Sequence, residues 1–429
     1  MNKKVIQILA NLSIKKWNKV QEATYESFAQ NDNNTILAPT GSGKTLAFLL
    51  PILTSEKPTL IITPTRELAL QIHSVIKDSK SKILSTVCYG GHSLTREANS
   101  LKANPKIVIG TPGRILDHID KKTISINLYE HLILDEYDKC LEMGFEDQIG
   151  NIYNHLAPSS ITLASATILD HIPAYMSNKD FKELNFLNEQ KPNIKYFKIS
   201  SSPEEKMEQT TDLVLSLKGE TSIVFCNHRE ATDRLEEMFW ENGIQTSKFH
   251  GGLEQIERER AIIKFQNKTC NVLVCTDLAA RGIDIADVDN VIHYQLPNDQ
   301  AQFVHRNGRT ARQGKDGKVY LILKRTDRIE KLTNEELNEL KLTNQPQKAH
   351  LTNWTTLFIG AGKKDKISKG DIAGFLIKKG NLEMQQIGKI DIKDVFCYVA
   401  IPSDKAKDVL KLTKGLRVKK KKPKIAISR

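Results

Sequence analysis

One stretch near the N-terminus constrains the fold more than any other. A short apolar run, Thr35-Ile36-Leu37, leads into the loop Ala38-Pro39-Thr40-Gly41-Ser42-Gly43-Lys44-Thr45, and an apolar helical run follows it. In a strand–loop–helix unit of this kind, backbone N–H groups at the helix N-terminus cradle phosphates. The usual loop has Gly where this chain has Ala38. The stretch predicts a parallel α/β sheet in which Lys44 reaches the β- and γ-phosphates of a nucleotide and Thr45 binds Mg²⁺.

Short β-branched runs alternate with amphipathic stretches over the first 330 residues, as in parallel sheets with crossover helices. The polar stretches 188–193 and 343–348 interrupt this alternation and predict linkers. The predicted domains are therefore 1–190, 193–342 and 351–429. The expected strands are 35–37, 59–62, 106–109, 132–134 and 161–163 in the first domain, and 222–225, 271–274, 290–292 and 318–321 in the second.

An acidic pair, Asp135-Glu136, ends the apolar run 132–134. Carboxylates at the end of a buried strand are costly without a cation or a chemical role. Following a phosphate loop, Asp135 is suited to holding Mg²⁺, directly or through water, and Glu136 to polarising an attacking water.

Three arginines, Arg306, Arg309 and Arg312, recur every three residues in the second domain. If the segment is helical they lie near one face. Together they could stabilise the γ-phosphate of a nucleotide bound by the first domain, although a solvated basic helix face would show the same spacing.

The net charge of +12 is unevenly distributed. Residues 351–429 contain 19 basic and 7 acidic residues, so the first 350 residues are neutral. A basic appendage on a neutral body is typical of polyanion binding, the alternative being a solubilising tail. Its apolar pattern argues against disorder and predicts the order β-α-β-β-α-β of an RRM-like fold, although the RNP1 consensus is not met around Phe396 and Tyr398.

The order of these motifs resembles that of DEAD-box RNA helicases, with the name motif written here as Asp135-Glu136-Tyr137-Asp138. The resemblance covers residues 14–325 and implies two RecA-like lobes that bind ATP and Mg²⁺. It implies that the lobes close over ATP, grip one RNA strand by its backbone and separate it locally from its partner strand.

The resemblance also assigns roles to individual residues. ATP contacts are implied for Gln21, which reads adenine, for the phosphate loop 38–45, for Gly282 and Asp284, and for the arginine fingers Arg309 and Arg312. Coupling of hydrolysis to strand separation is implied for Ser165, Ala166 and Thr167. RNA contacts are implied for Pro64, Thr65, Arg66, Gly90, Gly91, Thr111, Pro112, Gly113, Arg114, Thr276 and Asp277, and an RNA-side motif for His250, Gln255 and Arg258.

The chain departs from the family pattern at several positions. Tyr137 replaces a small Ala, Trp17-Asn18 replace Pro-Thr before the glutamine, and Asn307 and Ala311 replace Ile and Gly. We find no counterpart of the aromatic residue that stacks on adenine far upstream of the glutamine.

The segment 354–429 resembles the RNA-binding domain of DbpA-type helicases, which anchors the motor to a hairpin of large-subunit ribosomal RNA. The resemblance implies an rRNA-binding enzyme of ribosome biogenesis that associates with pre-ribosomal particles. Candidate phosphate contacts are Lys363, Lys364, Lys366, Lys369, Lys378, Lys379, Arg417 and the lysines of 419–424.

Two other classes of function remain as alternatives: a DNA helicase or translocase on the same scaffold, and a non-catalytic RNA-binding clamp. Gln21, Ser165-Ala166-Thr167 and the basic domain argue against the first, and the set Lys44, Glu136, Arg309 and Arg312 against the second. Six cysteines without a CxxC pair predict buried free thiols in a reducing compartment. With no long apolar run and no signal-peptide pattern, we expect a cytoplasmic monomer.

Overall fold

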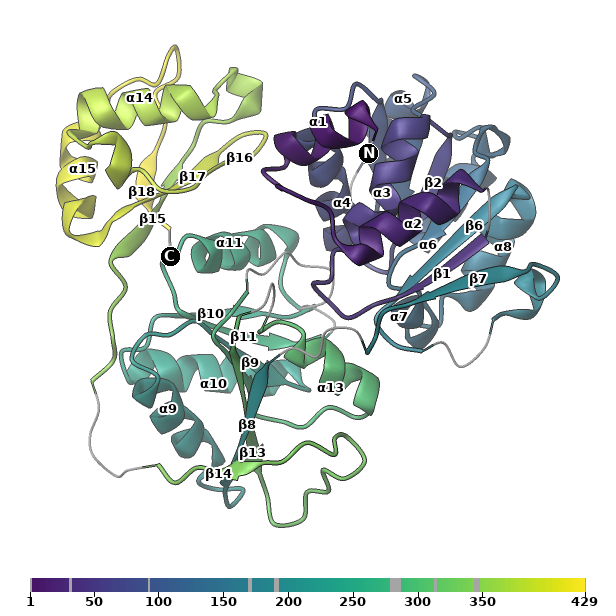
Figure 1. Cartoon of the computed structure of the whole chain (residues 1–429). Helices are drawn as coiled ribbons and strands as arrows, with labels where there is room; N and C mark the ends of the chain where they lie inside the picture. The colour runs from purple at the N-terminus through teal and green to yellow at the C-terminus, as the bar shows by residue number, and fades with distance from the viewer. Residues whose placement is uncertain are drawn as a thin grey trace. The chain divides into compact units, whose positions relative to one another are not determined.

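The computed structural model describes residues 2–30, 33–91, 93–168, 172–188, 193–277, 287–311, 315–342 and 348–428. The chain divides into two compact units near Asn193 and Ile194 (Figure 1). Most of the first linker predicted from the sequence, and the predicted linker residues 343–347, lie outside the described residues. Among the helices in these ranges, none combines the length and apolar character of a membrane span.

The first unit is built on a seven-stranded sheet in the order β3-β4-β2-β5-β6-β1-β7. Every strand pair in it is parallel. The crossover connections therefore place each strand's carboxyl end at the same edge of the sheet. The strands are β1 (Asn33–Leu37), β2 (Thr59–Ile62), β3 (Ser85–Cys88), β4 (Ile107–Gly110), β5 (His131–Leu134), β6 (Ser160–Ser165) and β7 (Phe181–Asn185).

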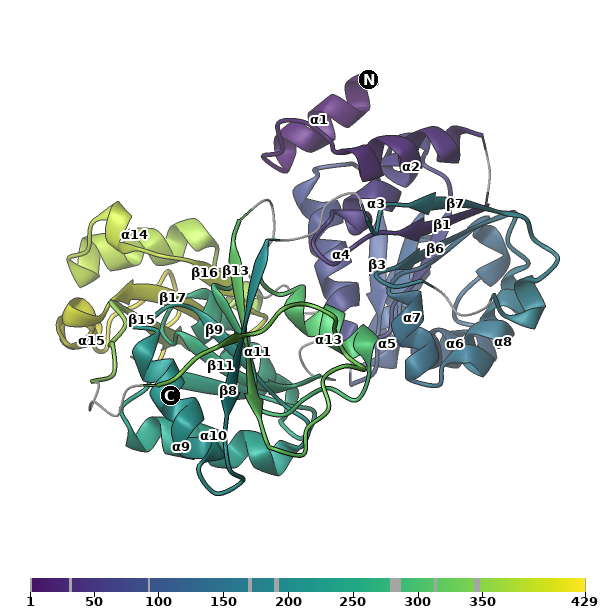
Figure 2. The same ribbon diagram turned by 60° about the horizontal axis from the view of Figure 1, so that its bottom comes forward.

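Helices cover both faces of this sheet, as the continuous apolar strands require. Figure 2 shows helices on either side of the sheet. On β2, Ile61 packs with the first helices of the unit, whereas its neighbours Leu60 and Ile62 pack with the later helices. The first set comprises α1 (Lys3–Asn11), α2 (Lys19–Ala29), α3 (Lys44–Ser55) and α4 (Arg66–Asp78), and the second α5 (Leu94–Leu101), α6 (Pro112–Asp120), α7 (Tyr137–Glu142) and α8 (Glu146–Leu156).

The second unit contains a similar sheet, in the order β10-β11-β9-β12-β13-β8-β14, again with parallel pairs. Its strands are β8 (Ile194–Ser200), β9 (Ser222–Cys226), β10 (Thr246–Phe249), β11 (Val272–Thr276), β12 (Asn290–His293), β13 (Gly317–Leu323) and β14 (Asn338–Glu339). The described α-helices around this sheet are α9 (Lys206–Ser216), α10 (Arg229–Glu241), α11 (Gln255–Gln266) and α13 (Gln300–Asn307).

A small antiparallel domain completes the second unit. Its four-stranded sheet has the order β16-β17-β15-β18, and its two α-helices pack on one face of that sheet. The elements are β15 (Trp354–Ile359), α14 (Lys369–Gly380), β16 (Ile390–Ile392), β17 (Cys397–Pro402), α15 (Ala406–Thr413) and β18 (Ile425–Ile427). The predicted fold class, two parallel α/β lobes followed by a small RRM-like domain, is confirmed.

The other face of the small sheet contacts the end of α11 and the loop after it. The buried Thr356 hydroxyl is 2.6 Å from the Thr269 hydroxyl and accepts a 3.1 Å hydrogen bond from Asn267 Nδ2. At the sheet edge, Lys393 Nζ lies 3.3 Å from a Glu259 carboxylate oxygen on α11. The small domain is therefore docked by polar contacts on the second lobe.

All nine strands expected in the two lobes are present, within about two residues of their bounds. The strands that the sequence did not indicate are β3, β7, β8, β10 and β14. The edge strand β7 is largely exposed and carries charged residues, so it lacks the apolar run that marks a buried strand. All six cysteines are buried free thiols.

The docking contact at Thr356 leads to a prediction about stability. Thr356→Val keeps the shape of the side chain but leaves the buried Asn267 amide and the partly buried Thr269 hydroxyl without this partner. We expect the second unit to lose about 1–3 kcal/mol of unfolding free energy, measured by urea unfolding, with faster hydrogen exchange around 267–270. Thr355→Val is the matched control, because the Thr355 hydroxyl bonds to Ser403 inside the small domain. Equal effects of the two variants on exchange at 267–270 would contradict the docking role.

Candidate functional site

The strand order of the first sheet separates the predicted site residues into two adjacent groups at its carboxyl edge. The loops after β3, β4 and β2 carry the expected RNA-backbone motifs. The loops after β5, β6 and β1 carry the acidic pair, the Ser165-Ala166-Thr167 motif and the phosphate loop. Open α/β sheets bind ligands at this edge. Neighbouring strands, and not neighbouring segments of sequence, therefore assemble each group.

The phosphate loop has the backbone conformation that its sequence predicts. Gly41 and Gly43 have φ values of +83° and +86°, a left-handed region that favours glycine. Lys44 begins α3 and is 8% exposed. Its Nζ donates hydrogen bonds to the carbonyl oxygens of Ala38 and, at 3.0 Å, of Pro39. The ammonium group is therefore held inside the loop, next to the helix N-terminus where phosphates bind.

Two side chains from the start of α2 support this loop. Asn18 and Gln21 form a reciprocal capping box at the helix N-terminus. Asn18 Nδ2 also donates to the Ser42 carbonyl at 2.7 Å, and Gln21 Nε2 to the Gly43 carbonyl at 3.5 Å. Gln21 is buried against the phosphate loop, and its contact with adenine stays a prediction.

The role of Asn18 was not predicted from the sequence, in which Asn18 stands out only as a departure from the family pattern. The spacing Asn-x-x-Gln before an apolar helix is a capping-box signal and could have identified it.

Asp135 has the environment of a cation ligand. It is 2% exposed, and its Oδ2 atom is buried without a hydrogen-bond partner among the described residues. Burial, together with the neighbouring Glu136 charge, raises the pKa of Asp135 to about 7, against the lowering effect of Lys44. A bound cation would favour the charged carboxylate. Asp135 and the hydroxyl of Thr45 thus fit the oxygen ligands that Mg²⁺ prefers.

The acidic motif is joined to the Ser165-Ala166-Thr167 motif by a side-chain contact. Thr167 Oγ1 donates a 2.9 Å hydrogen bond to Asp138 Oδ2. Ser165 Oγ donates a 2.6 Å hydrogen bond to the Thr167 carbonyl oxygen. Glu136 precedes α7 with a φ of +48°. Tyr137 points away from this site, because its fully buried ring belongs to the core beside α8.

The expected RNA motifs of the first lobe are also brought together. A Cβ atom on Gly91 would lie 2.9 Å from Arg66 Nη1, so the guanidinium group passes directly over this glycine. Arg114 Nε donates to the Tyr89 carbonyl oxygen at 3.1 Å. Thr65 caps α4, and Thr111 and Pro112 begin α6. Three loops distant in sequence therefore present their backbones and two arginines at one place.

In the second lobe, the structure corrects the interpretation of Arg306. Helix α13 ends at Asn307, so the three arginines do not share a helical face. Arg306 is 1% exposed, and Asp277 accepts both its Nε hydrogen bond at 2.6 Å and an Nη2 hydrogen bond. Asn227 Oδ1 accepts from Nη2 at 2.8 Å, and the Gln295 carbonyl from Nη1 at 2.6 Å. Arg306 thus joins the ends of β9, β11 and β12 and is not a phosphate ligand.

Arg309 lies beyond α13 and is 7% exposed. Thr276 ends β11, and Asp277 follows it. His250 is held by Asp233 at 3.3 Å. Gly282, Asp284 and Arg312 lie outside the described residues, so their roles stay predictions.

The basic loop of the small domain is exposed. Lys363, Lys364 and Lys366 all face solvent, while the backbone N–H groups of the first two donate to the carbonyls of Lys393 and Asp394. The lysines of 419–424 are not equivalent to them, because Lys419 is 2.7 Å from Asp371 and Lys421 is 3.1 Å from Asp365. These two expected phosphate contacts therefore already hold ion pairs within the domain.

Three family descriptions match the chain: "DEAD/DEAH box helicase" at residues 18–173, "Helicase conserved C-terminal domain" at 205–314 and "DbpA RNA binding domain" at 356–427. The ATP-dependent RNA helicase DbpA of Bacillus subtilis (strain 168) is 32% identical over 98% of this chain and 96% of its own length. DbpA of Escherichia coli (strain K12) is 32% identical over 94% of this chain and 92% of its own.

A solved structure of Dbp5 from S. cerevisiae, bound to RNA and ADP BeF3, has a similar fold. The TM-score is 0.70 and the sequence identity 27%, and the match covers 79% of this chain and 94% of that one. The similarity therefore extends through both parallel sheets.

The buried position of Arg306 predicts a large loss of stability on its removal. Arg306→Ala leaves the Asp277 carboxylate without its counter-charge, so we expect the second unit to lose about 3–5 kcal/mol of unfolding free energy in urea unfolding. The control is Lys318→Ala, which breaks a half-exposed ion pair with Glu220 in the same unit and should cost less than about 1 kcal/mol. A loss of unfolding free energy no larger than that of Lys318→Ala would contradict the internal, structural role of Arg306 and would again favour its interpretation as a phosphate ligand.

Proposed function

The chain belongs to the DEAD-box ATP-dependent RNA helicases with a DbpA-type C-terminal domain, and from this premise we propose that it remodels large-subunit ribosomal RNA during ribosome assembly. One observation carries the choice of RNA. A DbpA-type domain with an exposed lysine loop is docked on the lobe that also carries the residues predicted to contact RNA at the start of α11. The anchor and part of the motor thus form one compact unit.

We propose that the first lobe performs the ATP chemistry with the groups at the ends of β1 and β5. Lys44 leaves the carbonyl oxygens of its own loop and binds the β- and γ-phosphates. Glu136 polarises the attacking water. Thr45 and Asp135 would hold Mg²⁺, which neutralises charge on the phosphate oxygens. Asn18 and Gln21 keep the loop in its phosphate-binding conformation.

In this proposal, hydrolysis is transmitted to RNA through the contact between Thr167 and Asp138. A change around the γ-phosphate alters the acidic motif and, through this hydrogen bond, the end of β6. Arg309 and Arg312 of the second lobe stabilise the transferred phosphoryl group, with Gly282 and Asp284 contributing ATP contacts, so that ATP draws the lobes together. The closed lobes bend one RNA strand and release its partner.

RNA is held in two ways. The lobes bind phosphates and 2′-hydroxyls, which gives sequence-independent binding and a preference for RNA over DNA. The small domain binds a ribosomal RNA hairpin through Lys363, Lys364 and Lys366, and this contact selects the target. The enzyme works as a monomer in the cytoplasm and associates with pre-ribosomal particles.

The function is tested by comparing ATP hydrolysis in the presence of RNA and of DNA of the same length and sequence. We expect RNA to stimulate the rate and DNA to have little effect. Glu136→Gln should bind ATP and RNA normally and lower kcat by about 100-fold or more, because the attacking water loses its general base. Equal stimulation by DNA would favour the DNA translocase, and unchanged hydrolysis in Glu136→Gln would remove that residue from the mechanism.

The exposed lysine loop generates a second prediction. The triple variant Lys363→Ala, Lys364→Ala, Lys366→Ala should bind a ribosomal RNA hairpin more weakly and with a shallower salt dependence, by about 0.9 in log–log slope for each lost duplex phosphate contact. Its kcat on saturating generic single-stranded RNA should be unchanged. Binding is measured by fluorescence anisotropy over a salt series.

The matched control removes three exposed lysines of the same domain, with Lys405→Ala, Lys407→Ala and Lys411→Ala. The net charge changes equally in both triple variants. If both lose the same affinity, the loop contributes only general electrostatic attraction and the hairpin site lies elsewhere.

A further inference from the structure

We propose that Glu97 and His118 are positioning residues that fix Arg114 and the 89–91 loop for binding the RNA backbone, an inference that rests on the proposed function. Neither residue belongs to the motifs that the sequence analysis identified. Glu97 contacts Tyr89 in the loop after β3 and Arg114 on α6, and His118 contacts Glu97.

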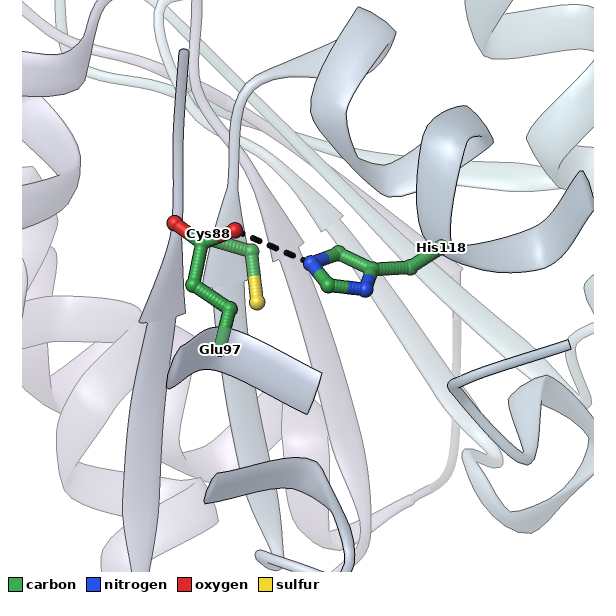
Figure 3. Close-up of side chains that lie close together, drawn as sticks. All are labelled: Cys88, Glu97 and His118. Carbon is green, nitrogen blue, oxygen red and sulfur yellow. Dashed lines mark hydrogen bonds and ion pairs between the residues drawn. The ribbon is translucent and has the colours of Figure 1, made fainter. Parts of the chain in front are cut away.

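Glu97 is a buried carboxylate that joins two of these loops. It projects from α5, is 2% exposed, and lies between the end of β3 and α6 (Figure 3). Its Oε1 accepts a 3.0 Å hydrogen bond from the Tyr89 N–H, immediately before Gly90. Its Oε2 lies 3.0 Å from His118 Nε2 and 3.4 Å from Arg114 Nε. One carboxylate therefore contacts the β3 loop and two side chains of α6.

Arg114 is the counter-charge that makes this burial favourable. An isolated buried carboxylate is costly, and pairing with a guanidinium group offsets the cost. The Arg114 Nε atom donates to the Tyr89 carbonyl, so the residue whose N–H binds Glu97 also accepts from Arg114. The outer Nη1 atom is 3.8 Å from Asp117, an exposed residue. Without Glu97, the pair with Asp117 would be the carboxylate attraction left to Arg114 among these contacts.

His118 completes the arrangement. Arg114 and His118 are four residues apart on α6, so both face Glu97. The imidazole is fully buried and is held through its second nitrogen, because Nδ1 lies 2.7 Å from the Thr123 hydroxyl. Since a carboxylate only accepts hydrogen bonds, Nε2 carries the hydrogen toward Glu97. The hydrogen bond from His118 Nε2 therefore holds the Glu97 carboxylate in the orientation in which it contacts Arg114.

Cys88 lies beside Glu97 and His118, and these three side chains could be mistaken for a metal site (Figure 3). The chemistry of the donors argues against it. Both oxygens of Glu97 already accept hydrogen bonds, and the Arg114 cation stands next to them. Burial, with the Glu97 charge, raises the pKa of the Cys88 thiol to about 12, so the thiolate that a metal needs is disfavoured. Substitution of Cys88 therefore distinguishes a metal site from a positioning role of Glu97 and His118.

The test compares Glu97→Leu, Glu97→Gln and His118→Asn with Arg114→Ala. We measure the Kd for a single-stranded RNA with a non-hydrolysable ATP analogue, the KM for RNA and kcat. Glu97→Leu should weaken RNA binding about tenfold, as expected for a lost charge-assisted contact, and raise the KM without changing kcat. Glu97→Gln should weaken it less, because the amide oxygen still accepts one hydrogen bond. ATP affinity should stay the same in all four variants.

A double variant establishes whether Glu97 acts through Arg114. If it does, Glu97→Leu combined with Arg114→Ala should bind RNA no more weakly than Arg114→Ala alone. Additive losses would show that Glu97 acts by another route and would overturn the inference. Thermal unfolding of each variant identifies any loss that comes from misfolding, and Glu97→Gln then provides the comparison in a folded protein.

Two controls use buried residues of the same lobe. His131→Asn makes the same chemical change at an equally buried imidazole, whose partners Ser160 and Thr162 are unconnected to the RNA motifs. Cys88→Ala removes the thiol of the third member of the cluster and leaves the contacts that Glu97 makes with Tyr89, His118 and Arg114 in place. Both should leave RNA affinity unchanged.

The outcomes separate the inference from the proposed function. If Arg114→Ala weakens RNA binding and Glu97→Leu does not, the positioning role is wrong and the proposed function stands. If Arg114→Ala has no effect on RNA affinity, the prediction that Arg114 and the 89–91 loop bind RNA is wrong, and the positioning role of Glu97 and His118 is wrong as well. If Cys88→Ala weakens RNA binding as much as Glu97→Leu, and the purified protein binds one zinc ion that each variant loses, the cluster is a metal site and our inference is overturned.

Discussion

The parallel pairing of the strands is the constraint on which the rest of this structure depends. In the first sheet, Cys88, Gly110, Ile62 and Leu134 are paired in one register across four strands. The loops that follow these residues therefore begin at the same level. Each crossover connection returns the chain to the other edge before the next parallel strand, so the loops that carry the predicted site residues of this lobe emerge at the carboxyl edge. The residues predicted to contact ATP and those predicted to contact RNA become neighbours through this single geometric rule.

Charged side chains near the carboxyl ends of the strands in the two lobes are paired in different ways. The Asp277 carboxylate has Arg306 as an internal partner and thereby fixes the ends of three strands in the second lobe. Glu97 has Arg114 and His118. One carboxylate oxygen of Asp135 is buried without a partner among the described residues. The positive charge of Lys44 partly opposes the rise in the pKa of Asp135 that burial causes. An ion pair that is complete within the protein serves structure or positioning, whereas an incomplete one is suited to a ligand that brings its own charge.

The small C-terminal domain, which matches the DbpA RNA binding family, uses both faces of its sheet for packing. One face of its sheet carries the two helices and the other contacts the second lobe around Thr356. The exposed lysine loop at 363–366 lies outside both of these contacts and stays available for a polyanion. Because Lys419 and Lys421 pair with Asp371 and Asp365, the basic tail is partly folded back on its own domain. A basic sequence therefore overstates the charge that the folded domain offers to RNA.

The sequence by itself determined the fold class, the phosphate loop, the acidic pair and the order of elements in the small domain. These features depend on local patterns: apolar runs, glycines at left-handed positions and residues that follow a strand directly. It did not determine which loops become neighbours, because the strand order β3-β4-β2-β5-β6-β1-β7 differs from the order along the chain. Tertiary structure also decided that Arg306 is internal while Arg309 lies past the helix end, and that Glu97 and His118, 21 residues apart, are in contact. Burial and pairing between distant segments are long-range properties, and no local pattern encodes them.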